Sequence, residues 1–123
     1  MSYIDGFVIA CPKANKEKFI EHARTGDSVF IDLGALRVVE CWGVDVPVGQ
    51  VTDFRMSVKA TPDEEIIFSW IEWPDKATRD AAMAKMMSPD FSDPRMDPAR
   101  NPMPFDGKRL IMGGFAPIVE LKR

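Results

Sequence analysis

The stretch PFDGKR, residues 104–109, carries the side chains best suited to hold a charged ligand. Asp106 and the glycine after it favour a turn, and Lys108 and Arg109 follow directly. Two cations presented by a turn can bind an anion such as a carboxylate or a phosphate. The alternative is a turn whose cations pair with acidic residues of the neighbouring loop.

A second group of charges lies in TDFR, residues 52–55, where Asp53 and Arg55 could pair with the first group, within one subunit or across a dimer. Trp42 and Trp70 could add an apolar wall to such a site. The sequence therefore predicts these ligand-binding residues: Asp53, Arg55, Trp42, Trp70, Asp106, Lys108 and Arg109.

Cys41 lies in ALRVVECWG, residues 35–43, between Glu40 and Trp42. A reactive thiol needs a nearby cation or a helix N-terminus to lower its pKa, and these neighbours supply neither. We expect Cys41 to pack in a strand, and Cys11 to be structural as well.

His22 is the only histidine, and it is flanked by Glu21 and Arg24. Nucleophilic sites of the Ser-His or Cys-His type and most haem sites need a histidine, but the helical position of His22 favours the helix surface or the seam between helix and sheet. One histidine and no closely spaced cysteine pair predict no zinc or copper site. We predict no metal and no cofactor.

Three carboxylates, Glu40, Asp45 and Glu72, could act as bases beside an apolar pocket. Reactions that need no cofactor require such a pocket and polar groups that deprotonate the substrate. Its candidate lining is tryptophan and methionine: Trp42, Trp70, Trp73, Met83, Met86 and Met87. The alternative is an ordinary core built from the same side chains.

Apolar alternation and turn signals predict the elements that would position these residues. Strands are expected at 3–10, 36–42, 64–73 and 109–120, and helices at 15–33 and 76–87. Gly26 could allow a kink in the first helix. Residues 52–60 are ambiguous: their alternation favours a strand or extended arm, whereas Thr52 could cap a short helix.

The element order β-α-β-β-α-β is the ferredoxin-like arrangement, an α+β fold with a four-stranded antiparallel sheet and both helices on one face. Both faces of this predicted sheet are apolar, however. In 64–73 the two sets are Ile66, Phe68 and Trp70 against Ile67, Ile71 and Trp73. If about six large side chains stayed in water, about 12 kcal/mol of stabilisation from apolar burial would be lost. This amount is similar to the whole free energy of unfolding of a domain. A homodimer through the sheet face removes this cost; the competing cover is the chain's own Pro-rich loop.

Length and composition predict a single domain spanning 1–123, with five of the ten prolines in a long loop at about 88–107. The net charge of −3 and the dispersed basic residues predict no nucleic-acid partner. The start MSYIDGFVIACP has no basic leader, and no apolar run is long enough to span a membrane. Two free cysteines fit a reducing compartment, so we expect a cytoplasmic protein.

Several stretches are distinctive: YIDGFVIACP, GALRVVECWGVDVPVG, FSWIEWPDKATRDAAMAKMMSP and PMPFDGKRLIMGGF. Together they resemble the YbaA-like bacterial family, a domain family of unknown function, over residues 3–116. That family is similar to the dimeric α/β-barrel superfamily of ferredoxin-like proteins, so the resemblance implies this barrel and a homodimer. The chemistry of that superfamily varies, and the resemblance assigns no catalytic residues.

Three functions remain open. The first is binding of a small apolar or anionic ligand. The second is a small-molecule enzyme of monooxygenase or isomerase type without a cofactor, which requires an enclosed pocket holding at least one carboxylate of perturbed pKa. The third is a protein-interaction module that acts through the Pro-rich loop.

Overall fold

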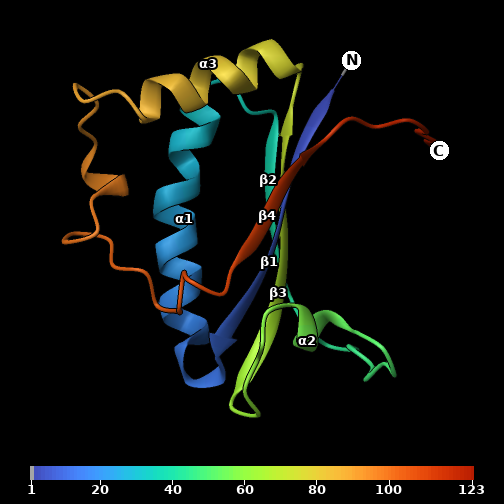
Figure 1. Cartoon of the computed structure of the whole chain (residues 1–123). Coiled ribbons are helices and arrows are strands. Elements are labelled where there is room, and N and C mark those ends of the chain that lie inside the picture. Colours follow the sequence, from blue (N-terminus) through green and yellow to red (C-terminus); the bar gives the residue numbers. More distant parts are fainter. Residues whose placement is uncertain (1) are drawn as a thin grey trace.

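The computed structural model describes residues 2–123 and contains a four-stranded sheet with two long helices packed on one face (Figure 1). The strands are β1 (Tyr3–Pro12), β2 (Arg37–Trp42), β3 (Glu64–Trp73) and β4 (Ile111–Phe115). The helices are α1 (Lys16–Asp32), α2 (Phe54–Ser57) and α3 (Lys76–Met86), with short 3₁₀ turns at Lys13–Asn15 and Pro94–Met96.

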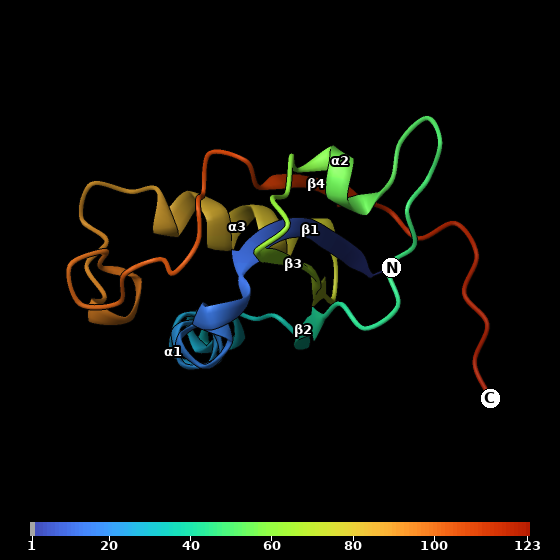
Figure 2. The ribbon, with the colours of Figure 1, turned by 90° about the horizontal axis from the view of Figure 1, so that it is seen from below.

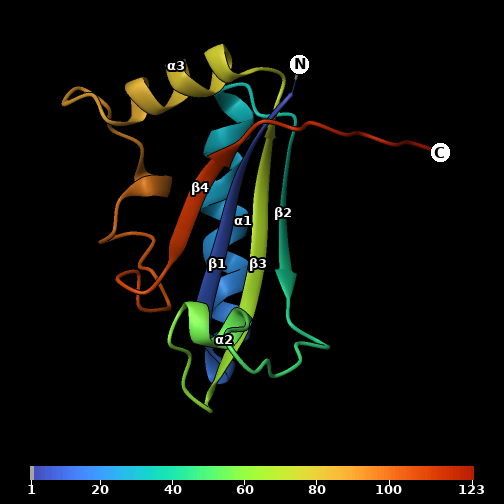
Figure 3. The ribbon, with the colours of Figure 1, turned by 45° about the vertical axis from the view of Figure 1, so that its right-hand side comes forward.

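The strand order is β2-β3-β1-β4, and every neighbouring pair is antiparallel. This order and the positions of α1 and α3 confirm the predicted ferredoxin-like α+β fold (Figures 1 and 3). The register pairs Phe7 with Ser69 and Glu40 with Ser69, so these three side chains share one face of the sheet. That face is covered by α1 and α3.

The helices begin and end for local reasons. The Asp75 carboxylate accepts a hydrogen bond from the Thr78 N–H and caps α3, as its sequence predicts. Gly34, with φ of +113°, follows α1. Gly26 does not break the first helix: α1 runs unbroken through this residue, which is buried against Asn101 of the Pro-rich loop.

Residues 52–60 are not a strand, and the preference for an extended arm was wrong. Within this stretch Phe54–Ser57 form the single-turn helix α2, and its cap is Asp53 rather than Thr52. The Asp53 carboxylate accepts hydrogen bonds from the Met56 and Gly49 N–H groups, which closes the turn. Val58, after α2, is buried against Ala10. The helix α2 lies over one end of the sheet face opposite α1 (Figure 2).

The Pro-rich loop packs on the outer side of α1 and does not cover the sheet face opposite it (Figure 1). Asn101 donates hydrogen bonds to the carbonyls of His22 and Arg95, and Asn15 donates to the Pro104 carbonyl. Past the small cover at α2, the rest of the second sheet face therefore stays open.

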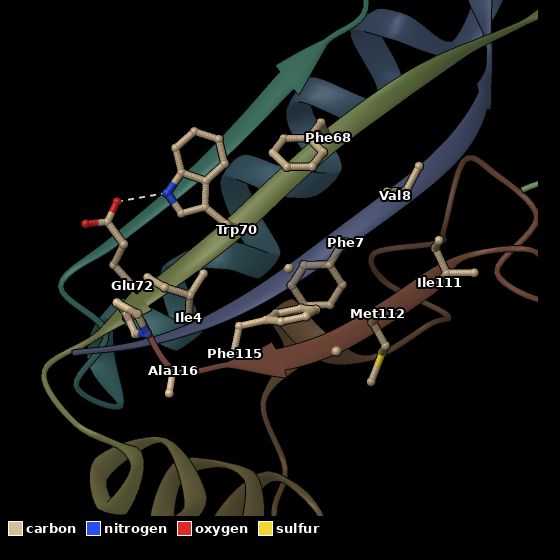
Figure 4. A pocket seen from close by; sticks show the side chains of 13 residues that line it. Ile4, Phe7, Val8, Phe68, Trp70, Glu72, Ile111, Met112, Phe115 and Ala116 are labelled. Carbon is tan, nitrogen blue, oxygen red and sulfur yellow. Dashed lines mark hydrogen bonds between the residues drawn. The ribbon is translucent and has the colours of Figure 1, made fainter. Parts of the chain in front are cut away.

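That open face is apolar. Phe68 and Phe115 are 45% and 59% exposed on it, and with Ile4, Val8 and Trp70 they line a shallow groove of about 740 Å³ (Figure 4). Its carboxylate, Glu72, accepts a hydrogen bond from the Trp70 indole N–H at 2.8 Å. This face offers packing area and little chemistry.

Candidate functional site

The space between α1 and the sheet holds two carboxyl groups among apolar side chains. Glu40 lies in the middle of β2, directly opposite Ser69 of β3, and both side chains point toward the helices. Asp27 lies on α1, one turn after Ala23, which is buried in the core. Together with His22 these side chains line one cavity of about 130 Å³.

Asp27 and Glu40 contact each other directly. Burial, the charge of Asp27 and the hydrogen bond between the two carboxyls raise the pKa of Glu40 to about 9. Burial also raises the pKa of Asp27, while its contact with Glu40 and the nearby His22 imidazole lower it in part. Two carboxyls this close titrate as a pair, and the pair keeps one proton at neutral pH.

The hydrogen bonding of Glu40 supports this protonation. Its Oε2 atom is buried and has no donor among the residues that the structure describes. A buried carboxylate oxygen without a donor is costly. A proton on one of the two carboxyls supplies an O–H donor between them and relieves the repulsion of two buried negative charges. The Ser69 hydroxyl, 2% exposed, makes a further hydrogen bond to Glu40 and opposes the rise of its pKa.

The cavity walls are largely aromatic. Phe7 and Ile9 of β1 form its floor, Phe19 and Phe30 of α1 form one side, and Phe105 closes it from the end of the Pro-rich loop. The rings of Phe19 and Phe105 lie 5.8 Å apart, centroid to centroid. Walls of this kind lower the local dielectric and strengthen the interaction between the carboxyls.

His22 stands between this cavity and a larger cleft. The cleft, of about 630 Å³, lies between α1 and residues 94–104, and His22 lines both spaces. The His22 Nδ1 atom lies 2.9 Å from the Asn101 Oδ1 atom. Lys18 and Arg100 line the cleft and give it positive charge, with Glu21 beside them.

The acid pair also borders a groove of about 440 Å³ between α1 and β2. Trp42 lines this groove, and the Lys16 ammonium lies 5.4 Å from the centre of its ring, which is a cation–π contact. The two carboxyls are therefore reached from the groove on one side and from the cavity beside His22 on the other.

Comparison with known proteins places this chain in a family. Residues 2–107 match the family described as "Protein of unknown function (DUF1428)". The chain belongs to the DUF1428 family. It is 55% identical over 120 residues to "Uncharacterized protein YbaA" of Escherichia coli K12 and to the protein of the same name from Shigella flexneri, with 98% of this chain and 99% of each relative covered. These matches confirm the predicted resemblance to the YbaA-like bacterial family.

A solved structure shares the fold of this DUF1428 protein. It is described as a dimeric ferredoxin-like protein from an uncultured marine organism, with a TM-score of 0.58 and 12% sequence identity. The alignment covers 98% of this chain and all of the other. The similarity supports the ferredoxin-like fold, and the word dimeric describes that protein.

The seven ligand-binding residues predicted for this DUF1428 protein do not converge on one site. Arg109 donates to both carboxylate oxygens of buried Glu64, at 2.8 and 2.7 Å, and to Asp106 at 2.9 Å. These bonds hold the pKa of Glu64 down to about 2. The geometry is that of a turn held by salt bridges, but the partner outside the turn is Glu64 of β3 and not the neighbouring loop that the alternative predicted. Lys108 stays exposed.

Asp53 caps α2, and Arg55 pairs with Glu65 at 2.8 Å instead of with the 104–109 turn. Arg55 does meet Arg109 indirectly, because it donates to the Glu64 backbone carbonyl. Trp42 lies beside the acid pair, and Trp70 lies on the open face of the sheet. Ligand binding by these residues stays a prediction.

Of the three candidate bases in this DUF1428 protein, only Glu40 lines the cavity. Asp45 is exposed, and Glu72 lies on the open face. The sequence reasoning missed Asp27 and set His22 aside. A signal was available: Glu40 alternates with Val38 and Trp42 on the inward face of β2, and Asp27 follows Ala23 by one helical turn, so both are charged side chains at core positions.

In the part of the chain that is described, we find no helix with the length and apolar character that crossing a membrane requires.

Proposed function

We propose that this protein is an enzyme that transfers protons on a small, mainly apolar molecule, with Asp27 and Glu40 as its acid–base pair. The observation that carries this proposal is the contact of two carboxyls in an aromatic cavity, where a buried oxygen of Glu40 has no donor among the described residues. The enzyme hypothesis required an enclosed pocket holding a carboxylate of perturbed pKa. Strongly perturbed carboxyls in a cavity are typical of catalytic groups.

The environments of the two carboxyls suggest their roles. Glu40 keeps the proton and donates it to an oxygen on which negative charge develops, because its pKa is raised the most. Asp27 carries the negative charge and accepts a proton, since its hydrogen bond with Glu40 favours its charged form. Two carboxyls whose environments push their pKa values apart form a common acid–base arrangement. Ser69 stabilises the Glu40 carboxylate that remains after donation.

Binding without turnover is the second candidate function. The cleft beside His22 favours it, because Lys18 and Arg100 give that cleft positive charge suited to an anionic group. A bound anion there would place the rest of the molecule next to the cavity.

A deuterium-uptake screen separates the two functions. The protein is incubated in D₂O with a library of small metabolites, and mass spectrometry records which compounds gain deuterium. The enzyme predicts uptake that is lost in Glu40→Gln but kept in Asp45→Asn, a matched change of an exposed carboxylate. A compound that stays bound to the protein, with no deuterium uptake by any compound of the library, would support binding without turnover and contradict the proposed enzyme activity.

We also propose that two copies associate through the open sheet face. The exposed aromatic side chains of that face, its groove of about 740 Å³, and the description of the structurally similar ferredoxin-like protein as dimeric support this assembly. The Pro-rich loop does not compete for the face, because it lies against α1.

The remaining expectations stay predictions. These are the cytoplasmic location, the absence of a nucleic-acid partner, and the use of the Pro-rich loop as an interaction module. The Pro-rich loop is fixed to α1 by a hydrogen bond from Asn101, and to the turn before α1 by a hydrogen bond from Asn15. An interaction partner would therefore have to bind the loop in this position.

A further inference from the structure

We infer that His22 is a catalytic base of this site, with its proton held on Nδ1 by Asn101 and its Nε2 free to accept a proton from a small ketone or aldehyde that bears a C–H bond next to the carbonyl. The inference rests on the proposed function and extends it by naming a third catalytic group and a class of substrate. It is carried by the hydrogen bonding of one amide.

The Asn101 amide has only one orientation that satisfies its neighbours. Its Nδ2 donates to the Arg95 carbonyl at 2.8 Å and to the His22 carbonyl at 3.2 Å. Carbonyl oxygens only accept hydrogen bonds, so a flipped amide would set oxygen against oxygen twice. The Asn101 Oδ1 atom must therefore accept, and the atom 2.9 Å from it, His22 Nδ1, must donate.

A neutral imidazole with its proton on Nδ1 has a lone pair on Nε2. Among the described residues, no hydrogen-bond partner reaches Nε2. Asn101 lines the outer cleft, whereas His22 lines both the cleft and the cavity that contains the acid pair. The imidazole is thus tied to the loop by one nitrogen, and the other is available to a bound molecule.

Packing fixes the ring in this position. The Phe105 ring meets it edge-on at 6.1 Å between centroids, and the Phe19 ring lies at 6.3 Å. A base held by a second group and by aromatic walls is pre-oriented for proton abstraction. Asn101 acts here as a positioning residue.

The cavity then offers a base and an acid to one small molecule. Its volume of about 130 Å³ and its phenylalanine walls fit a small apolar body, and its polar groups come from His22, Asp27, Glu40 and Ser69. A carbonyl oxygen can accept the Glu40 proton, while the C–H next to the carbonyl faces His22. A carbonyl with an adjacent C–H bond is the group that uses a proton donor and a base together most directly.

The step balances without a co-reactant. The C–H bond breaks and its proton forms an N–H bond on His22 Nε2, while the electron pair becomes the C=C bond of an enol. The carbonyl oxygen gains the Glu40 proton, which leaves Glu40 as a carboxylate. Return of the His22 proton to the same carbon gives exchange, and return to another carbon of a conjugated enol gives an isomer; in both cases Glu40 recovers its proton from the hydroxyl.

The tautomer is tested first, by ¹⁵N-resolved NMR of the imidazole in the full-length protein. Because the chain has one histidine, both nitrogen signals belong to His22. We expect a protonated Nδ1 and an unprotonated Nε2 in the neutral ring, and a mixture of tautomers in Asn101→Leu. A protonated Nε2 in the unmodified protein would overturn the role of His22 and leave the acid pair untouched.

The chemistry is tested by hydrogen–deuterium exchange at the carbons next to the carbonyl of cyclopentanone, followed by ¹H NMR in D₂O. The unmodified protein should accelerate exchange over buffer, and His22→Gln should lower that acceleration about 100-fold or more. Glu17→Gln, an exposed change on α1, should retain it within about twofold, since Glu17 lines neither the cleft nor the cavity. Thermal unfolding of each variant confirms that it is folded.

The outcomes separate the two proposals. Exchange lost in Glu40→Gln but kept in His22→Gln would overturn the inference and support the acid pair alone. Exchange lost in His22→Gln but kept in both Glu40→Gln and Asp27→Asn would contradict the proposed function. No acceleration by the unmodified protein would overturn the carbonyl class.

Discussion

Glu40 occupies a position that a sheet of this kind normally fills with an apolar side chain. Its neighbours on the inward face of β2 are Val38 and Trp42, and its partner across the sheet is Ser69. A carboxyl group there weakens the core, because charge is costly in apolar surroundings. The cost is reduced when Glu40 keeps a proton beside Asp27, which is the property that the proposed chemistry uses.

This protonation predicts an unusual dependence of stability on pH. The pKa of Glu40 rises from an ordinary 4.5 to about 9 on folding, so the folded chain holds a proton that the unfolded chain has released. The free energy of unfolding contributed by this group is therefore fully present below 4.5 and falls as pH rises toward 9.

Glu40→Gln should remove this dependence. The variant keeps the shape and a donor toward Asp27, and at about pH 8 it should be more stable than the unmodified protein by about 1 kcal/mol or more. Urea unfolding across the pH range measures the difference, with Asp45→Asn as a control. The opposite result would be a difference in stability, variant minus unmodified protein, that falls from about pH 5 to about pH 8. That result would show that Glu40 is charged in the folded protein.

Asp5 is a second buried acid, and its carboxylate is surrounded by hydrogen-bond donors. It accepts hydrogen bonds from the Trp73 indole at 2.9 Å and from the Arg79 guanidinium at 2.9 and 3.1 Å. Asp5→Ala leaves the Trp73 indole without its acceptor and Arg79 with only the exposed Asp80, so it should lower the free energy of unfolding by about 3 to 5 kcal/mol. Asp80→Asn removes an exposed partner of the same arginine and should change the free energy of unfolding by less than about 1 kcal/mol.

At the scale of elements, the strands follow from the sequence because apolar side chains on both faces of the sheet give long apolar runs. The helix α2 does not, since its alternating apolar residues imitate a strand and its real determinant is one carboxylate. The Asp53 carboxylate accepts hydrogen bonds from the N–H group of Gly49, four residues before it, and from that of Met56, three residues after it. Turn chemistry of this kind overrides an alternation of four residues.

The role of Asp53 gives a test with a close control. Asp53→Ala should lower the free energy of unfolding by about 1 kcal/mol and raise hydrogen exchange at Met56 and Ser57, because the cap is lost. Thr52→Ala should change the free energy of unfolding by less than about 0.5 kcal/mol and should leave hydrogen exchange at Met56 and Ser57 unchanged. Equal effects of the two changes would mean that Asp53 is not the cap.

The candidate site was only half accessible to sequence reasoning, for a reason that also lies at this scale. Glu40 could be placed on one face of its strand, but its partner Asp27 lies on a helix whose rotation against the sheet is set by tertiary packing. The bond of His22 to Asn101 joins residues 79 positions apart. Helical spacing places Asp27 at a core position, but neither its pairing with Glu40 nor the bond of His22 to Asn101 leaves a periodic signal in one sequence.

For the whole molecule, the expectation with the greatest consequence is the apolar second face. The strand faces follow the predicted alternation, and the Pro-rich loop lies elsewhere, yet α2 and Val58 cover one end of the face from within the chain. The area left for a second copy is thus smaller than the sequence suggested, and it centres on Phe68, Trp70 and Phe115 (Figure 4).

Association through this face predicts a clear effect of a single charge. Phe115→Asp should convert a dimer into a folded monomer, because a carboxylate at the centre of the interface would be buried without a partner. Met87→Asp, on the helix side, should remain dimeric. Light scattering after size-exclusion chromatography measures the mass of each, and a monomeric unmodified protein at micromolar concentration would contradict the assembly.

The most direct measurement for the account as a whole is a pH titration of the side-chain carboxyl carbons of Asp27 and Glu40, followed by ¹³C NMR and assigned with Asp27→Asn and Glu40→Gln. A shared proton in the cavity predicts two linked transitions, with the upper midpoint far above the usual range of a glutamate, near 9. If both carboxyls lose their protons together at about pH 4, as exposed side chains do, the cavity holds two charges and the proposed chemistry is wrong.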